Sequence, residues 1–244
     1  MHIILKILLE SILPVLLLLP LIMIFTKDEN QIKTIGFFLF IFICYQLILK
    51  IPIEYKELQF INGKRNWTGK LIGIFFGSVT YLLIYKKLQP FTFLRIKQDP
   101  NKLAKTILIC FILIFTAFFS CFDSAKEFDI EILIFQLTMP GLDEEIMFRG
   151  ILLALLLTCL KDKIKIGKRT FGNPGILIIG LLFGLVHGGS VTNKLELNFE
   201  FYPFIWTFIS GYIWSWATVE SKSILLPILS HNLTNFIQNL VRMV

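Results

Sequence analysis

Long apolar blocks separated by short charged loops run through the whole sequence. Within the blocks the hydrophobic residues form continuous runs, without the alternation of a half-buried strand or the single stripe of a soluble amphipathic helix. Most blocks approach the roughly 20 residues that a transmembrane helix needs. We predict membrane-spanning helices at residues 3–26, 34–52, 70–86, 105–122, 128–160, 174–188, 201–219 and 223–243.

The fifth block, residues 128–160, is too long for one straight helix. Pro140 and Gly141 stand inside it, and proline lacks the N–H group that a helix interior uses. We therefore expect a break that separates a short apolar arm at 129–138 from a main helix beginning near Leu142.

Composition supports the membrane assignment. The chain has 244 residues, of which 55% are hydrophobic, and a mean hydropathy of +0.74, too apolar for a soluble domain of this size. We expect one all-α, polytopic membrane domain of about eight transmembrane helices, with N-terminal helices in 1–125 and a catalytic bundle in 126–244. The abundance of Phe, Ile, Lys and Asn is typical of AT-rich bacterial genomes, so the expected location is a bacterial plasma membrane.

The formal net charge of +7 is carried by short loops, which indicates membrane topology and contact with lipid rather than nucleic-acid binding. Lys and Arg are more frequent in the odd-numbered loops, which favours both termini outside the cytoplasm. In the first block Lys6 and Glu10 are one turn apart, which allows an ion pair. The cysteines lack metal or redox spacing and are expected to pack as small apolar residues: Cys44, Cys110, Cys121 and Cys159.

The first polar motif inside an apolar block is Glu144-Glu145-x-x-x-Arg149. Glu145 and Arg149 are four residues apart, the favourable order for an ion pair on a helix. Glu144 points about 100° away and is left without a local partner near the expected helix start. Burial and the helix N-terminus then act in opposite directions on its acidity, which suits a group that transfers protons. The alternative is a helix end whose acids are solvated at the membrane surface.

The second motif is GLLFGLVHGG. Gly180, Gly184 and Gly188 form a ridge of small residues that allows another helix to approach closely. Phe183 and His187 lie four residues apart on the neighbouring face. A single membrane histidine is also compatible with a purely structural hydrogen bond.

The third motif lies in LLPILSHNLTNFIQNL. His231, Asn235 and the pair Gln238/Asn239 form a polar stripe on an otherwise apolar helix. Such a stripe should face the bundle interior or a water-filled cavity rather than lipid. Hydrogen bonding between helices is the alternative function for the stripe.

Together the motifs predict a hydrolytic centre shielded from lipid. Glu144 would be the general base for water, His187 and His231 would orient that water, and Asn235 with His231 would donate to an oxyanion. There is no His-Glu-x-x-His sequence of the zinc metalloprotease type, no Gly-x-Gly-Asp and no Gly-x-Ser-Gly.

The order E-E-x-x-x-R, F-x-x-x-H and H-x-x-x-N on successive late helices resembles the CPBP family, the CAAX-prenyl endopeptidases and bacteriocin-processing or self-immunity "Abi" membrane proteases. The resemblance covers about residues 130–240. It implies an eight-helix intramembrane protease that cleaves membrane-bound peptides or proteins, with Glu144 and His187 activating water and His231 and Asn235 forming an oxyanion hole. Glu145, Arg149 and Phe183 match the same motifs as supporting residues.

The family has also been described as metallo-type. Our expectation is that no zinc or other cofactor is required. If a metal were used, its ligands would be Glu144, His187 and His231, with water in the fourth position.

Two other classes of function compete with the enzyme. One is a non-catalytic bacteriocin-immunity or partner-binding membrane protein on the same scaffold, in which an unpaired Glu144 would serve no purpose. The other is a transporter or channel, which should place polar residues in the early spans. The blocks 34–52, 70–86 and 105–122 show almost none.

Overall fold

The computed structural model describes residues 2–120 and 127–243, and within them the chain is mainly helical. The helices are α1 (His2–Phe25), α2 (Ile32–Glu54), α3 (Trp67–Leu88), α4 (Pro100–Ala117), α5 (Ile130–Glu145), the π-helical segment η4 (Ile146–Leu152), α6 (Leu153–Cys159), α7 (Pro174–Gly188), α8 (Phe201–Ser221) and α9 (Leu225–Val241). Single 3₁₀ turns are η1 (Glu29–Gln31), η2 (Lys56–Leu58) and η3 (Phe118–Ser120). Two short hairpins join β1 (Lys165–Ile166) to β2 (Arg169–Thr170), and β3 (Gly189–Val191) to β4 (Leu197–Phe199).

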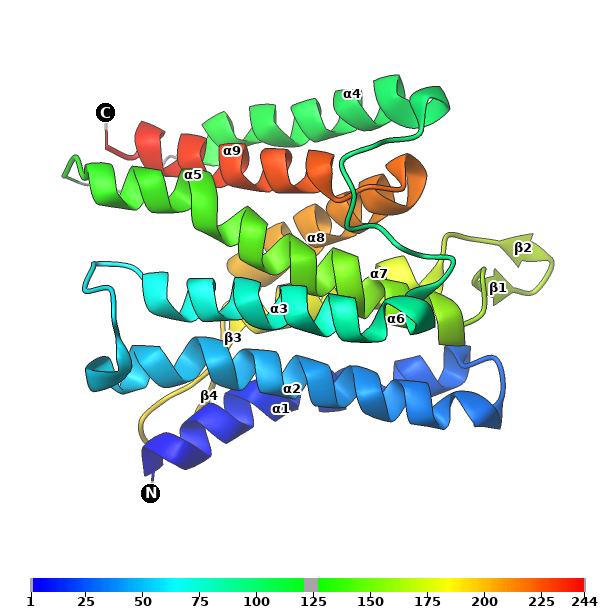
Figure 1. Ribbon diagram of the computed structural model, residues 1–244, viewed down its shortest axis with the longest axis horizontal. Helices are drawn as coiled ribbons and strands as arrows, with labels where there is room; N and C mark the ends of the chain where they lie inside the picture. The colour runs from blue at the N-terminus through cyan, green and yellow to red at the C-terminus, as the bar shows by residue number, and fades with distance from the viewer. Residues whose placement is uncertain (1, 121–126, 244) are drawn as a thin grey trace.

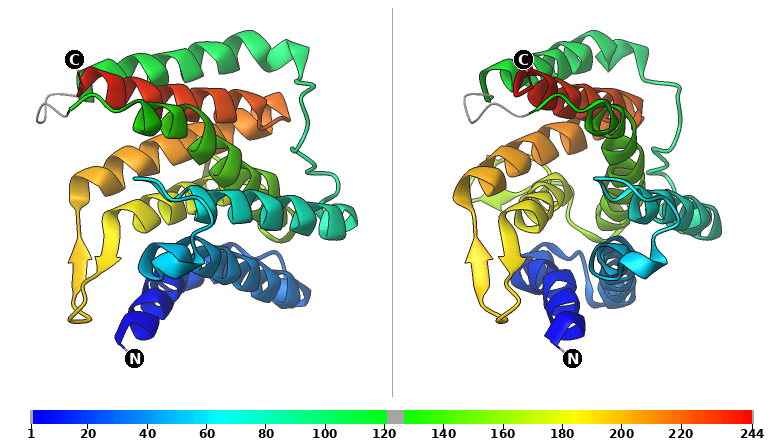
Figure 2. Two further views of the ribbon diagram at one scale, coloured as in Figure 1. Left: turned by 60° about the vertical axis from the view of Figure 1, so that its left-hand side comes forward. Right: turned by 90° about the vertical axis from the view of Figure 1, so that its left-hand side faces the viewer.

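The helices run back and forth along one common direction (Figures 1 and 2). Each apolar block of the sequence contains a helix, so the expected all-α architecture is confirmed. Among the described residues, four helical segments are long and apolar enough to cross a membrane: 2–25, 29–54, 67–88 and 100–117. Helix α7 is apolar but shorter, so the expected count of eight spans is not confirmed. The domain boundary at 125/126, Cys121 and the end of the block 105–122 lie outside the described residues.

The expected break at Pro140 does not occur. Helix α5 continues through Pro140, and η4 and α6 follow without interruption, although Figure 1 shows the path bending along its length. Asn232 of α9 bonds backbone groups of α5 on either side of Pro140. Its Oδ1 accepts from the Gly141 N–H (2.7 Å), and its Nδ2 donates to the Thr138 carbonyl (3.1 Å). Neighbouring polar side chains allow proline inside membrane helices in this way. Glu144 therefore lies deep within a helical run and not at a helix start.

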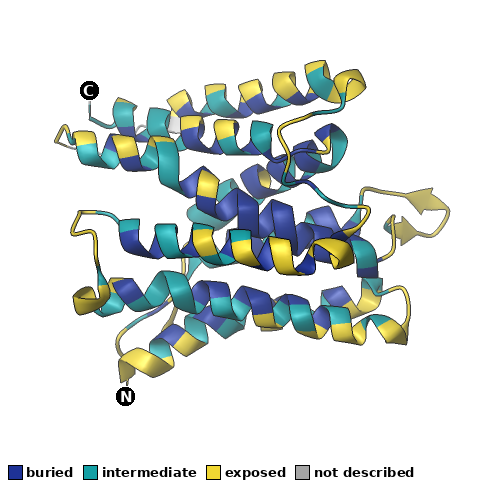
Figure 3. Ribbon diagram, viewed as in Figure 1, coloured by how far each residue is buried: buried dark blue, intermediate teal, exposed yellow. Residues whose placement is uncertain are grey.

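The run that carries the acids is the centre of the bundle. From Asp143 to Leu160 every residue except Thr158 is buried (Figure 3). Helices α2, α3, α7 and α8 all contact this run. After Arg149 the run carries no charged side chain until Lys161, as expected of a helix in such an enclosed position.

The bundle has two ends, and backbone hydrogen bonds between segments that are distant in the sequence mark one of them. At one end Lys27 N donates to Cys159 O (3.0 Å), and Ile224 N donates to Phe93 O (3.0 Å). This end, called end A, holds the connections α1–α2, α3–α4, α6–α7 and α8–α9. The opposite end, end B, holds both termini, the α2–α3 loop and hairpin β3–β4 (Figure 1).

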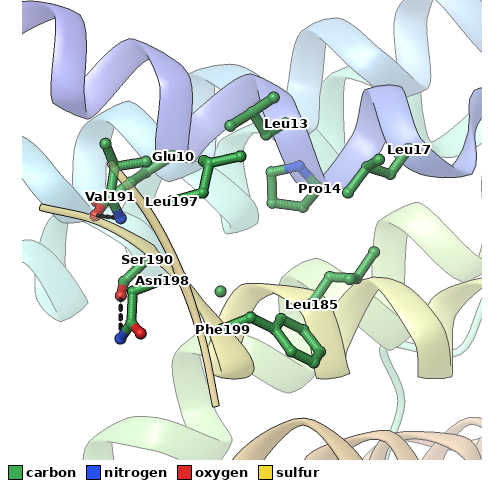
Figure 4. Close-up of a pocket in the computed structure, with 11 residues that line it drawn as sticks. Glu10, Leu13, Pro14, Leu17, Leu185, Ser190, Val191, Leu197, Asn198 and Phe199 are labelled. Carbon is green, nitrogen blue, oxygen red and sulfur yellow. Dashed lines mark hydrogen bonds between the residues drawn. The ribbon is translucent and has the colours of Figure 1, made fainter. Parts of the chain in front are cut away.

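Helices α1 and α2 are joined by two ion pairs that the sequence did not predict. Lys6 pairs with Glu54 (2.5 Å), and Lys50 pairs with Glu10 (2.9 Å), so Lys6 and Glu10 do not pair with each other. Antiparallel packing brings these opposite charges together between the helices. Glu10 also accepts a hydrogen bond from Val191 N (2.9 Å), which ties hairpin β3–β4 to α1 beside an apolar cavity of about 180 Å³ (Figure 4).

Candidate active site

A polar cavity of about 270 Å³ lies among α3, α5, α7, α8 and α9. All four residues predicted to be catalytic, Glu144, His187, His231 and Asn235, line it. Phe183 and Trp214 supply part of its aromatic wall. The structure therefore brings residues from three separate late helices to one place, as the order of the motifs predicted.

The two carboxylate oxygens of Glu144 have different surroundings. Oε1 accepts a short hydrogen bond from Lys70 Nζ (2.5 Å). Oε2 faces the Nε2 atoms of His187 (3.7 Å) and His231 (4.0 Å), distances too long for direct hydrogen bonds. Within residues 2–120 and 127–243, no group donates to Oε2 although it is buried. This oxygen is directed at the space between the imidazoles.

His187 is held in a defined tautomer. Its Nδ1 lies 2.8 Å from the Phe183 carbonyl oxygen, which can only accept, so Nδ1 carries the proton. In the neutral ring, Nε2 then presents a lone pair toward Glu144. The ring lies against Phe183 (centroids 4.4 Å apart), and the His187 side chain is 33% exposed, which leaves it accessible from the cavity.

His231 is held by an acid on one side and by an indole on the other. Its Nδ1 lies 2.8 Å from Glu145 Oε1, and its ring stacks on Trp214 with centroids 4.2 Å apart and an interplanar angle of 16°. The ring orientation is thereby fixed, and Nε2 points to the cavity side. Unlike His187, this side chain is almost fully buried.

The predicted ion pair between Glu145 and Arg149 is present, with Arg149 NH1 donating to Glu145 Oε1 at 3.0 Å. Both side chains are fully buried. Arg149 also donates to the Gly211 carbonyl (3.1 Å) and lies over the Phe183 ring (4.5 Å). Glu145 thus connects Arg149 with His231. Arg149 lies within the π-helical segment η4, which Glu145 directly precedes, and such segments often occur at functional sites.

The expectation that Glu144 has no partner is wrong. Lys70 Nζ contacts Glu144 and also donates to Asp143 Oδ2 (2.8 Å), which accepts a second hydrogen bond from the Tyr45 hydroxyl (2.6 Å). Lys70, Asp143 and Tyr45 are all buried. The early helices therefore contribute polar side chains to the interior. A lack of polar residues in the early spans is thus no longer a reason to exclude a transporter.

A sequence signal for Lys70 did exist. Asn66 caps α3 by accepting from Gly69 N (3.0 Å), which makes Trp67 the first helical residue and places Lys70 inside the helix rather than in a loop. Lys70, Gly73 and Gly77 then follow helical spacing along one face. An added Cβ at Gly73 would contact Asp143, and one at Gly77 would contact Ile146, so this face packs on α5 and η4.

Two asparagines of α9 lie in different surroundings. Asn235 is half-buried at the cavity wall, one turn beyond His231, and its carbonyl accepts from Asn239 Nδ2 (2.9 Å). Asn232, which was not among the predicted site residues, bonds the backbone of α5 at Gly141 and Thr138.

The donor set at Glu144 is poorly suited to a metal ion. Oε1, one of the two oxygens that would ligate the cation, is already in contact with the Lys70 ammonium group. A second positive charge at this distance disfavours a divalent ion. In the described part of the chain, no group of three or more His, Cys, Asp or Glu side chains has an arrangement that could hold a metal ion.

Comparison with known proteins identifies the region that carries this site. The family model described as Rce1-like, type II CAAX prenyl endopeptidase Rce1-like, matches residues 126–237, which include Glu144, His187, His231 and Asn235. Comparison with curated proteins found no match, and comparison with solved structures found none either. Over residues 126–237 the chain is therefore similar to the Rce1-like family of type II CAAX prenyl endopeptidases, within the CPBP family of membrane proteases.

Proposed function

We propose that this chain is a multi-pass intramembrane endopeptidase of a bacterial plasma membrane that hydrolyses membrane-associated peptides or proteins. One observation supports the proposal above others. A buried carboxylate oxygen, Glu144 Oε2, faces two imidazole Nε2 atoms across a polar cavity inside an otherwise apolar bundle. Such a group is costly in a membrane protein unless it is used.

In the proposed reaction Glu144 is the general base. It takes one proton from a water molecule placed between Oε2 and the Nε2 atoms of His187 and His231, and the water oxygen bonds to the scissile carbonyl carbon. The carbonyl π electrons move to its oxygen and form an oxyanion. When the C=O bond is restored, the C–N bond breaks, and the proton held by Glu144 passes to the leaving nitrogen. The products are one carboxylic acid and one amine.

Asn235 and His231 are the proposed oxyanion donors. Because the Nδ1–H of His231 is directed at the Glu145 carboxylate, its Nε2 can donate only when the ring is a doubly protonated imidazolium. Both line the cavity on the same helix, four residues apart, so their side chains lie on one face. The contact of His231 with Glu145 and Trp214 holds its ring in place before the reaction. Preorganised donors of this kind stabilise the transition state without reorientation during the step.

We propose that the reaction needs no metal ion, because the Lys70 ammonium group occupies one side of the Glu144 carboxylate. After purification and washing with a chelator, the protein should cleave its substrate at an unchanged rate. Zinc content measured by plasma mass spectrometry should be far below one ion per chain. Stoichiometric zinc, with activity that disappears on its removal and returns on its addition, would show that the ligands are used as a metal site.

The function is tested by incubating the purified full chain in detergent or vesicles with two kinds of probe. One is a farnesylated peptide ending in a CAAX sequence, and the other is a set of unprenylated single-span peptides. Cleavage sites are mapped by mass spectrometry, with Glu144→Gln protein as the control. Cleavage by the wild type alone supports the proposal. If neither kind of probe is cleaved, a non-catalytic immunity or partner-binding function gains the support that the protease loses.

A further inference from the structure

We propose that Lys70 is a positioning residue for the general base, holding Glu144 Oε1 so that Oε2 is presented to the cavity. The inference rests on the proposed function for its catalytic meaning. It concerns α3, which lies outside the family match to residues 126–237. The N-terminal helices would then complete the catalytic centre rather than only support it.

The Lys70 ammonium group is held in place by buried hydrogen-bond partners. Its ammonium group bridges Asp143 Oδ2 (2.8 Å) and Glu144 Oε1 (2.5 Å), and Asp143 is fixed in turn by the Tyr45 hydroxyl (2.6 Å). Gly73, one turn along α3, leaves room for the Asp143 carboxylate. The Lys70 side chain is only 11% exposed, so its ammonium group has little room to move away from the two carboxylates.

The balance of charge explains why a cation is needed at this point. Three consecutive acids, Asp143, Glu144 and Glu145, are buried together. Arg149 neutralises Glu145, and Lys70 is the cation in contact with the other two. A carboxylate without a partner in an apolar interior favours its protonated form, which cannot accept a proton from water. Lys70 therefore keeps Glu144 both oriented and charged.

Comparison of Lys70 with a second lysine, Lys50, distinguishes positioning of Glu144 from a general contribution to the stability of the fold. Lys50 also forms a partly buried interhelical ion pair, with Glu10 at 2.9 Å, and its side chain is 21% exposed. It does not line the catalytic cavity. Lys70→Met and Lys50→Met each remove one ammonium group from an early helix, but only the first removes a partner of Glu144.

The first experiment does not depend on any substrate. Full-length protein in detergent is treated at neutral pH with dicyclohexylcarbodiimide, which labels protonated carboxyl groups in apolar surroundings, and labelling of Glu144 is quantified by peptide mass spectrometry. We expect roughly tenfold or more label at Glu144 in Lys70→Met than in the wild type, since the neutral acid is favoured once the cation is lost. Lys50→Met should label as the wild type does.

The second experiment uses the cleavage assay. Lys70→Met should lower kcat by about 10- to 100-fold with KM little changed, a smaller loss than removal of the base itself. Lys70→Arg should recover part of the rate, because it retains the charge. In the Glu144→Gln background, Lys70→Met should cost nothing further, since residues that act as a unit are not additive. Lys50→Met should keep the wild-type kcat.

Two outcomes would overturn the inference. One is unchanged labelling of Glu144 in Lys70→Met protein. The other is a loss of rate of equal size in the wild-type and Glu144→Gln backgrounds, which would mean that Lys70 acts independently of Glu144. If the wild type cleaves no probe, the proposed function fails, and the labelling result alone decides the relation between Lys70 and Glu144.

Discussion

The three consecutive acids illustrate how neighbouring residues of one helix acquire different partners. Successive side chains point about 100° apart, so Asp143 faces α2 and α3, Glu144 faces the cavity, and Glu145 faces Arg149 and His231. The division of labour between Glu144 and Glu145 follows from this rotation, with one acid exposed to the reacting space and the other enclosed in a structural network.

The two acids should therefore respond differently to the same substitution. Glu144→Gln should reduce the cleavage rate by roughly 10²- to 10⁴-fold, as expected for loss of a general base, with the thermal midpoint in detergent little changed because Asp143 still pairs with Lys70. Glu145→Gln should lower activity and also stability, by roughly 3–5 kcal/mol, because it leaves Arg149 buried without its counterion.

Cleavage rate and thermal unfolding are measured on both variants under one set of conditions. An active Glu144→Gln protein beside a stable but inactive Glu145→Gln protein would reverse the two assignments. Normal cleavage by both variants would show that neither acid takes part in catalysis.

Site residues could be predicted from the sequence where a polar side chain stands out among apolar neighbours. His187, His231 and Asn235 were visible because they are polar groups inside apolar blocks. Lys70 was not, because a lysine at the edge of an apolar block gives the same pattern whether it is solvated or buried. The Asn66 cap places Lys70 inside α3, but its burial became evident only through Asp143, a partner 73 residues away in the chain.

At the scale of elements, the contact between α7 and α8 follows from the glycine ridge of α7. An added Cβ at Gly180 would lie 3.1 Å from Tyr212, and one at Gly188 would lie 2.5 Å from Phe204, so the two helices meet almost backbone to backbone. This contact keeps His187 and Trp214 on the walls of the same cavity.

Gly184→Ala should therefore destabilise the protein, by about 1–3 kcal/mol, because its Cβ would lie 2.9 Å from Phe208 Cβ and 3.0 Å from the Phe204 carbonyl oxygen. Gly36→Ala in α2 is the matched control, since an added Cβ there has no neighbour within 4 Å. It should be neutral or slightly stabilising, as alanine is the better helix former. Thermal unfolding in detergent compares the two, and equal midpoints would mean that α7 and α8 do not pack closely.

Helix positions were predicted well from the sequence, but helix continuity was not. The length of an apolar block locates a helix because hydrocarbon thickness sets that length. The effect of Pro140 depends on a partner from another helix, Asn232, and no pattern within residues 128–160 contains that information.

For the whole molecule, charge is distributed unequally between the two ends. In the described residues, end A carries fourteen Lys and Arg side chains: Lys27, Lys33, Lys86, Lys87, Arg95, Lys97, Lys102, Lys105, Lys161, Lys163, Lys165, Lys168, Arg169 and Lys222. End B carries eight: Lys6, Lys50, Lys56, Lys64, Arg65, Lys70, Lys194 and Arg242. The excess of basic residues predicts that end A is cytoplasmic. The cavity lies nearer end B, because Lys70 lies near the start of α3 there and His187 lies in the last turn of α7 there.

This orientation is measured by cysteine accessibility in intact bacterial cells. In a chain from which the four native cysteines have been removed, Lys163→Cys at end A and Asn193→Cys in hairpin β3–β4 are both exposed positions. A membrane-impermeant maleimide should label Asn193→Cys in intact cells and Lys163→Cys only after the cells are opened. The reverse result would place the cavity on the cytoplasmic side.

The size of the cavity has a consequence for the conformation of the substrate. A helix with its side chains is about 10–12 Å wide, whereas the cavity holds only about 270 Å³, so a folded transmembrane helix does not enter it. A few residues of the substrate must unwind, and their freed backbone groups need partners such as Gln136 and Thr207 on the wall. Cleavage should therefore be faster in peptides with glycine or proline near the scissile bond, and equal rates for a matched polyleucine peptide would argue against unwinding as the limiting step. Selectivity would then depend on how readily a substrate helix frays as well as on its side chains.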